Sequence, residues 1–156
     1  MPRTVLDAGA VVNTCCLKTH RFGGHFTLSL KNTIGMVAKY MPGDEYNYMT
    51  ELHASALVLL DGVQALTDGG PDTGTLASPG IILAGTDRVA VDAVGVAILR
   101  SLGTTEEVSR GSIWDLEQLR RAVELGLGAA GPEQVELVTA DAASEKAADE
   151  VRGLLA

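Results

Sequence analysis

Short apolar runs separated by polar segments recur along the first half of the chain. Three of them, at residues 5–12, 56–60 and 81–84, predict buried strands. Residues 26–30 alternate between apolar and polar positions and predict a further strand or extended segment, as do residues 134–139 near the end. Between the second and third runs, residues 67–80 are rich in glycine and predict a long loop.

The second half of the chain has helical patterns. Thr86 or Asp87 is a suitable N-cap for a helix over residues 89–102, which is apolar nearly all round and is therefore expected to be buried. A capping box at residues 112–115 predicts a helix that ends near residue 125, with Gly126 as its stop. Residues 142–155 have the pattern of a surface helix with one apolar face.

This alternation of strands and helices predicts an α/β fold with a mostly parallel sheet and helices on both faces, in three layers. A length of 156 residues favours one domain over residues 1–156, in which residues 134–156 form a terminal strand and helix. A chain of this size buries enough surface to form a core without disulfides.

Composition and charge exclude several classes of protein. The formal net charge of −8 argues against binding to nucleic acid or to a membrane surface, because phosphate groups would repel it. No stretch approaches the ~20 apolar residues of a membrane span, and the first residues do not form a signal peptide. The two cysteines, Cys15 and Cys16, are neighbours and read best as small hydrophobic residues, so a cytoplasmic location is expected.

The positive charge is concentrated in one window. No acidic residue occurs between Asp7 and Asp44, and a local cationic field of this kind attracts anions. The basic residues of this window are Lys18, His20, Arg21, His25, Lys31 and Lys39. The alternative is a solvated basic loop that balances the acidic helices.

Two acids and one further histidine are also candidates for chemistry. Asp61 follows an apolar run, and Asp92 lies one turn into an apolar helix, where its carboxylate must be paired or capped. As structural alternatives, Asp61 would be a turn acid and Asp92 would interact with the helix dipole. His53, two residues after Glu51, would bind a metal or act as a base, although a lone histidine is more often structural.

Several segments of the chain, in order, resemble the domain-of-unknown-function family 362 over about residues 5–130. The most specific are Lys-Thr-His at residues 18–20 and Lys-Asn-x-x-Gly at residues 31–35; the others are at residues 11–13, 60–63, 69–71, 84–87 and 89–93. The resemblance implies one site formed by these residues: Lys18, His20, Lys31, Asn32, Asp61 and Asp92.

The chain also departs from the family pattern. Family members usually have a longer N-terminal half with a lysine-proline-asparagine strand, and they commonly show proline and lysine where this chain has Cys15 and Cys16. Some relatives carry a ferredoxin-like module, but an iron–sulfur cluster is not expected here because its ligation needs about four thiolates. The site would then be only partly formed, or completed by a partner chain.

Two functions follow from these observations. In the first, the domain binds a small phosphate or carboxylate and acts as an enzyme. Lys18 and Lys31 hold the anion, His20 is the acid or base, and Asp61 or Asp92 orients the ligand or binds a divalent metal. The further ligand-binding residues would be Thr19, Asn32, Gly35 and His53.

In the second function, the chain is a non-catalytic subunit or shortened relative that works by association with itself or a partner chain. This second function predicts an open sheet edge or a large apolar patch.

Overall fold

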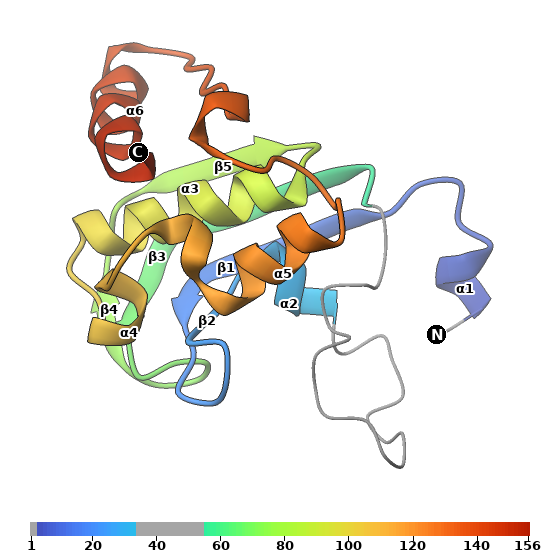
Figure 1. Ribbon diagram of the computed structural model, residues 1–156, viewed down its shortest axis with the longest axis horizontal. Helices are drawn as coiled ribbons and strands as arrows, with labels where there is room; N and C mark the ends of the chain where they lie inside the picture. The colour runs from blue at the N-terminus through green and yellow to red at the C-terminus, as the bar shows by residue number, and fades with distance from the viewer. Residues whose placement is uncertain (1–2, 34–54) are drawn as a thin grey trace.

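The computed structural model describes residues 3–33 and 55–156, so the predicted site residues Gly35 and His53 lie outside the described residues. A mixed sheet lies at the centre of the fold (Figure 1). Its strands are β1 (Val12–Thr19), β2 (Phe26–Thr27), β3 (Leu57–Asp68), β4 (Thr75–Ala77) and β5 (Ile81–Gly85). The helices are α1 (Arg3–Leu6), α2 (Ser29–Asn32), α3 (Arg88–Ser101), α4 (Glu106–Ser109), α5 (Glu117–Glu124) and α6 (Ala142–Leu155), with short 3-10 turns η3 (Ile113–Asp115) and η4 (Pro132–Gln134).

The strands of the sheet run in both directions. The order is β2-β1-β3-β4, and β5 pairs with β3 beside β4. The central pair, β1 and β3, is parallel, whereas β2, β4 and β5 each run antiparallel to their neighbours. The α/β class is therefore confirmed, with a parallel pair at the centre of a mixed sheet.

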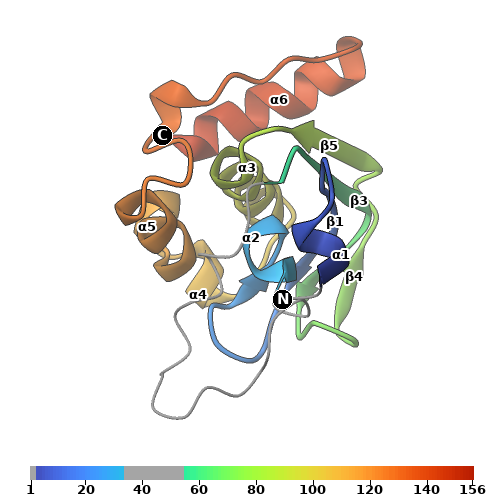
Figure 2. The ribbon, with the colours of Figure 1, turned by 90° about the vertical axis from the view of Figure 1, so that its right-hand side faces the viewer.

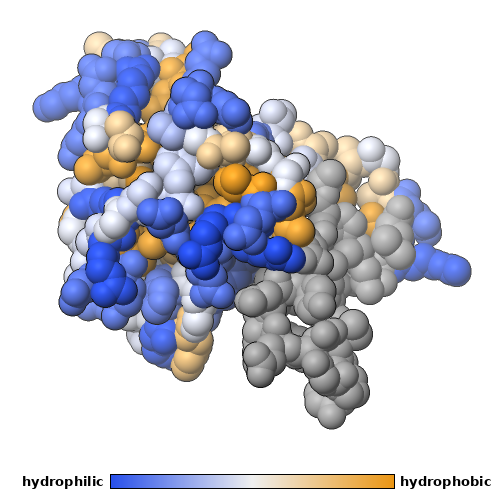
Figure 3. Space-filling model, viewed as in Figure 1, coloured by the Kyte–Doolittle hydropathy of each residue, from blue (hydrophilic) through white to orange (hydrophobic). Residues whose placement is uncertain are grey.

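In the described part of the chain, helices α2 to α5 lie on one side of the sheet, and no helix lies against the other side (Figure 2). Helix α6 packs on α3, and α1 lies beyond the start of β1 (Figure 1). The predicted third layer is therefore not confirmed. The surface on the helical side is largely hydrophilic, with apolar side chains visible between the helices (Figure 3). None of the helices in the described ranges is long and apolar enough to cross a membrane.

Helix α3 forms the centre of the core, as its apolar pattern predicts. Asp87 is its N-cap and accepts hydrogen bonds from the backbone of Val89 at 2.8 Å and Ala90 at 3.0 Å. A Cβ atom at Gly95 would lie 2.7 Å from the side chain of Leu28, so glycine lets α3 approach the sheet closely. Most of the α3 side chains are buried.

The first predicted strand is wrong. Residues 3–6 form the short helix α1, and the strand begins only at Val12 and continues to Thr19, through the segment expected to be a loop. Along β1, the alternate side chains Asn13, Cys15, Leu17 and Thr19 are buried. Because two of these four side chains are polar, the strand does not appear as an apolar run.

The prediction that a strand ends at Asp61 is also wrong. Strand β3 continues through Asp61 and Gly62 to Asp68. The side chain of Asp61 accepts a hydrogen bond from the backbone N–H of Val63 at 2.9 Å. The register between β3 and β1 shifts at this point, because Cys16 pairs with Asp61 but Lys18 pairs with Leu66. The Asp-Gly pair therefore produces a bulge in a continuing strand.

The outcome in the last third of the chain is mixed. The surface helix over residues 142–155 is confirmed as α6, with Asp141 as its N-cap. Ser112 caps η3, and the predicted helix after it is divided into η3 and α5. The predicted strand at residues 134–139 is wrong, because η4 includes Gln134 and residues 135–139 have no strand partner.

Candidate functional site

Four basic side chains surround the end of β1, and we call them the basic cluster: Lys18, His20, Arg21 and Lys31. Lys18 is near the end of β1, His20 and Arg21 begin the loop to β2, and Lys31 is on α2. The backbone N–H of His20 donates to the carbonyl of His25 at 2.8 Å, which closes this loop on itself. Residues from three consecutive elements are thereby brought to one corner of the sheet.

The glycine-rich loop between β3 and β4 supports the basic cluster from the neighbouring strand. The backbone N–H of Arg21 donates to the carbonyls of Gly69 at 3.1 Å and Gly70 at 3.3 Å. A Cβ atom at Gly70 would lie 1.9 Å from the carbonyl oxygen of Thr19, so only glycine permits this contact. The two loops are therefore held together by their backbones.

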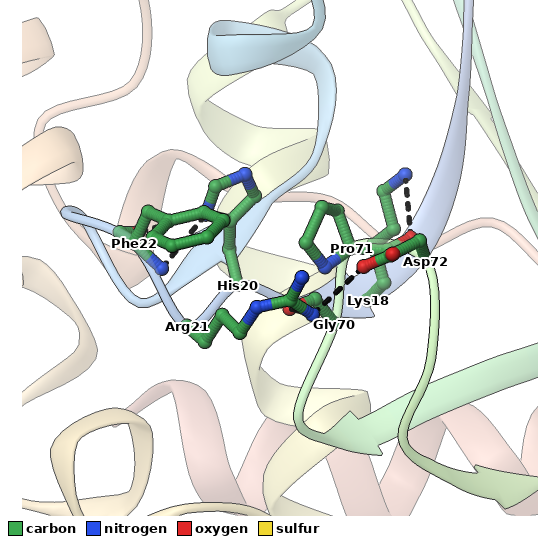
Figure 4. A network of polar contacts seen from close by, with 7 residues as sticks. All are labelled: Lys18, His20, Arg21, Phe22, Gly70, Pro71 and Asp72. Atoms are coloured by element: carbon green, nitrogen blue, oxygen red, sulfur yellow. Dashed lines mark hydrogen bonds and ion pairs between the residues drawn. The ribbon is translucent and has the colours of Figure 1, made fainter.

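Side chains extend this contact between the loops (Figure 4). The guanidinium of Arg21 donates to the carbonyl of Gly70 at 3.1 Å and forms an ion pair with Asp72 at 2.7 Å. The ammonium of Lys18 contacts the carbonyl oxygen of Pro71 at 3.4 Å. The charge of Arg21 is thus already neutralised, whereas Lys18 has only one weak contact to a carbonyl.

Lys31 reaches the loop from α2. Its ammonium donates to the carbonyl of Gly23 at 2.6 Å and lies 3.5 Å from that of Phe22. Only 8% of the residue is exposed, and this burial lowers the pKa of Lys31. Among the side chains that the structure describes, no carboxylate forms an ion pair with Lys31 or Lys18.

His20 lies within the field of all three cations. Burial lowers the pKa of His20, the charges of Lys31, Lys18 and Arg21 lower it further, and its hydrogen bond to the carbonyl of Phe22 opposes the shift. Nδ1 lies 2.7 Å from that carbonyl, and the ring meets the Phe22 ring edge-on at 5.6 Å. These effects together favour the neutral imidazole, which is able to donate or accept a proton.

A buried carboxylate fixes the start of the helix that carries Lys31. Asp92, on α3, accepts hydrogen bonds from the backbone N–H of Ser29 at 2.8 Å and of Leu30 at 3.0 Å, and from the Ser29 hydroxyl at 2.5 Å. Helix α2 has only four residues and no N-cap side chain of its own. A helix this short is not stable in isolation, so Asp92 acts as a cap supplied by another helix.

The guanidinium of Arg88, four residues before Asp92 on the same helix, holds the carbonyl groups of the same two residues of α2. It donates to the carbonyls of Ser29 and Leu30, both at 3.1 Å. Burial raises the pKa of Asp92 to about 6, while the hydrogen bonds from Ser29 and Leu30 and the charge of Arg88 act in the opposite direction. We call Asp92, Arg88 and Ser29 the α2 clamp.

Asn32 connects α2 to β1. Its amide nitrogen donates to the side-chain oxygen of Asn13 at 2.7 Å and to the carbonyl of Thr14 at 2.8 Å. The amide of Asn13 in turn donates to the carbonyl of Ser29 at 2.8 Å. Asn32 therefore has a clear structural role, and its predicted role in ligand binding stays a prediction.

The acids and Thr19 do not join the basic cluster as the sequence suggests. Asp92 is completely buried beneath α2 and has no surface toward a ligand. Asp61 projects from the face of the sheet opposite α2, level with Cys16 on β1, and Lys18 projects from this same face. The hydroxyl of Thr19 is buried and donates to the carbonyl of Leu66 at 3.1 Å. The two carboxylates therefore lie on opposite sides of the sheet, and of the predicted set Lys18 and Lys31 are the residues whose charges act on His20.

Sequence reasoning missed the α2 clamp residues Ser29 and Arg88. Ser29 is part of the alternating segment that predicted a strand, and Arg88 stands just before the helix predicted over residues 89–102. The available signal was Asp92 itself, since a carboxylate in an apolar helix requires partners.

Within residues 3–33 and 55–156, no group of three or more His, Cys, Asp or Glu side chains is placed to hold a metal ion. Both cysteines are free; Cys15 is buried, and burial raises the pKa of its thiol to about 12, whereas Cys16 is exposed. The prediction that both cysteines are buried is therefore correct only for Cys15.

Comparison with known proteins identifies a family. The model of a family described as a domain of unknown function (DUF362) matches residues 1–97, which include the basic cluster and the α2 clamp. No curated protein and no solved structure matches the chain.

Proposed function

The chain belongs to the DUF362 family, and we propose that it binds a small phosphate- or carboxylate-bearing ligand at the basic cluster. The observation that carries this proposal is that Lys18 and Lys31, which form no ion pair with any described carboxylate, both act on the imidazole of His20 and lower its pKa. Like charges held close together repel each other, and an anion placed among them relieves that repulsion.

The two lysines have hydrogen-bonding capacity left for such a ligand. An ammonium group has three N–H donors. Lys18 uses one of them in a weak contact, and Lys31 directs its donors to two carbonyls. Arg21 is paired with Asp72 and serves to fix the loop. Lys18 and Lys31 are therefore the side chains that we expect to hold the anion.

His20 is the group that would provide acid or base chemistry. A neutral imidazole beside a bound anion donates one hydrogen bond, and its pKa rises when negative charge is added nearby. Bound phosphate would therefore make His20 a better proton carrier. Asp61 and Asp92 have no part in this proposal, because Asp61 is not among the charged groups that act on His20 and Asp92 is enclosed.

The test is calorimetric titration with inorganic phosphate and with a dicarboxylate, at pH 7 and low salt. We expect Lys18→Gln and Lys31→Met each to weaken binding about tenfold, since one charge-assisted hydrogen bond contributes about 1.5 kcal/mol or more. The matched control is Lys146→Gln, which removes an exposed lysine on α6. Equal affinity of all four proteins would refute the proposal.

A further inference from the structure

The face of the sheet on which no described helix packs is unusually apolar. The paired registers place alternate side chains of β1, β3, β4 and β5 on it: Val12, Thr14, Cys16, Lys18, Leu57, Leu59, Asp61, Leu66, Leu76, Ile82 and Ala84. We call this surface the open face. Its most exposed apolar side chains are Ile82 at 70%, Leu76 at 63% and Val12 at 53%.

A sheet face that stays in water normally alternates to polar residues. The open face does not, and a parallel central pair such as β1 and β3 is normally covered on both sides. A continuous apolar surface of this kind marks an interface. Figure 2 shows the open face turned away from all the helices that cover the sheet.

The charges on the open face indicate which partner fits it. Lys18 and Asp61 lie on adjacent strands, because Asp61 is level with Cys16, two residues before Lys18. Neither forms an ion pair with another described side chain. A surface that carries one basic and one acidic side chain is complementary to itself when two copies are related by a two-fold axis. Lys18 of each copy then lies opposite Asp61 of the other copy. We propose that the open face binds a second copy of this chain.

The size of the open face fits a weak dimer. The 12 residues of β3 extend about 40 Å at ~3.3 Å per residue, and three strands side by side span about 14 Å. Because β1 has 8 residues and β4 and β5 have 3 and 5, each face covers only about 440 Å². Two such faces bury on the order of 900 Å² together, below the ~1,000 Å² of a stable specific interface and in the range of weak, transient contacts. The dimer therefore forms reversibly and depends on concentration.

The acid at the centre of the open face sets the register of the dimer. One carboxylate oxygen of Asp61 already accepts the N–H of Val63, which leaves the other oxygen for the lysine of the second copy. A carboxylate buried between two sheets without a cation would strongly oppose association. Asp68, the last residue of β3, lies at the rim and is not enclosed.

Sedimentation velocity over a wide concentration range tests this proposal. The unmodified chain is expected to shift from monomer to dimer, and Ile82→Asp is expected to remain monomeric. The matched control is Val138→Asp, which changes an apolar side chain that is 85% exposed and lies outside the sheet; this variant should dimerise normally. Circular dichroism establishes that each variant is folded.

A charge exchange distinguishes the second copy from other partners. Lys18→Glu and Asp61→Lys should each abolish the dimer, and the double variant should restore it. The comparison of Ile82→Asp with Val138→Asp leaves the basic cluster unchanged, so that readout is independent of anion binding. The proposal is overturned if the unmodified chain is monomeric throughout, which would assign the open face to a different protein, or if Ile82→Asp dimerises as well as the parent.

Discussion

Deleting the hydroxyl of Ser29 is the sharpest perturbation of the α2 clamp. The Ser29 residue is completely buried, and its hydroxyl lies 2.5 Å from a carboxylate oxygen of Asp92 and 3.2 Å from the carbonyl of Arg88. Ser29→Ala removes one atom from a close-packed site and leaves both backbone N–H donors to Asp92 in place. The change therefore isolates one hydrogen bond to a buried charge.

The expected loss of stability follows from that contact. A hydrogen bond to a charged group contributes about 1.5–3 kcal/mol. Because the carboxylate keeps two of its three donors, we expect a value in the lower half of that range, about 2 kcal/mol at pH 7.

The destabilisation should depend on pH. Burial raises the pKa of Asp92 from 3.8 to about 6, so the stability due to this group is greatest below its unfolded pKa and is lost as the pH rises through its folded pKa. The Ser29 hydroxyl lowers the pKa of Asp92, so Ser29→Ala should raise it further. Each additional pKa unit corresponds to about 1.4 kcal/mol at high pH. The effect of Ser29→Ala should therefore be largest near neutral pH and decrease as the pH falls toward 4.

Urea unfolding followed by fluorescence measures this effect. The chain has a single tryptophan, Trp114, whose indole N–H donates to the carbonyl of Leu155 at 3.2 Å and reports on the packing of α6. The control is Ser101→Ala, which removes an exposed hydroxyl bonded within its own helix and should change stability by less than about 0.5 kcal/mol. A loss for Ser29→Ala that is no larger than in the control, or is the same at pH 4.5 as at pH 7, would refute the reasoning.

Three further substitutions test the packing around the site. Gly70→Ala should lower the free energy of unfolding by about 2 kcal/mol in urea melts, because the new Cβ overlaps the carbonyl of Thr19. Leu60→Ala should cost about 2–5 kcal/mol in the same assay, since the side chain has no exposed surface. Gln118→Ala should cost about 1 kcal/mol and increase amide exchange in the loop to β2, because Gln118 donates to the carbonyl of Gly24 at 2.8 Å.

Elements that depend on local chemistry could be predicted from the sequence. The start of α3 follows from the capping chemistry of Asp87, and α6 follows from its helical repeat of apolar residues, although the residues that are buried are Ala148, Val151 and Leu155. Local hydrogen bonds and a helical repeat specify both elements, so no knowledge of distant contacts is needed.

Elements whose formation depends on a neighbouring strand could not be predicted from the sequence. The alternation at residues 135–139 correctly separates Val135 and Leu137, which pack on the core, from the exposed Val138. A period of two reports which side chains are buried, but a strand also needs a neighbour for its backbone, and none is present beside this segment in the described part of the fold.

In the candidate site, too, the features that depend on local sequence could be predicted, and those that depend on distant contacts could not. The acid-free window around Lys18 and Lys31 indicated a cationic region, and both charges act on His20. The positions of Asp61 and Asp92 depend on which face of the sheet each side chain occupies, and this required the register of β3 and the path of α2.

The most direct test of the basic cluster is the pKa of His20 measured by NMR titration of its imidazole signals. The account predicts a pKa below 6.5 in the free protein, because burial and three cations disfavour the imidazolium. It predicts that the pKa rises on addition of saturating phosphate, and that it lies higher in free Lys31→Met than in the free parent. A pKa that does not change with phosphate or with the loss of Lys31 would contradict the account.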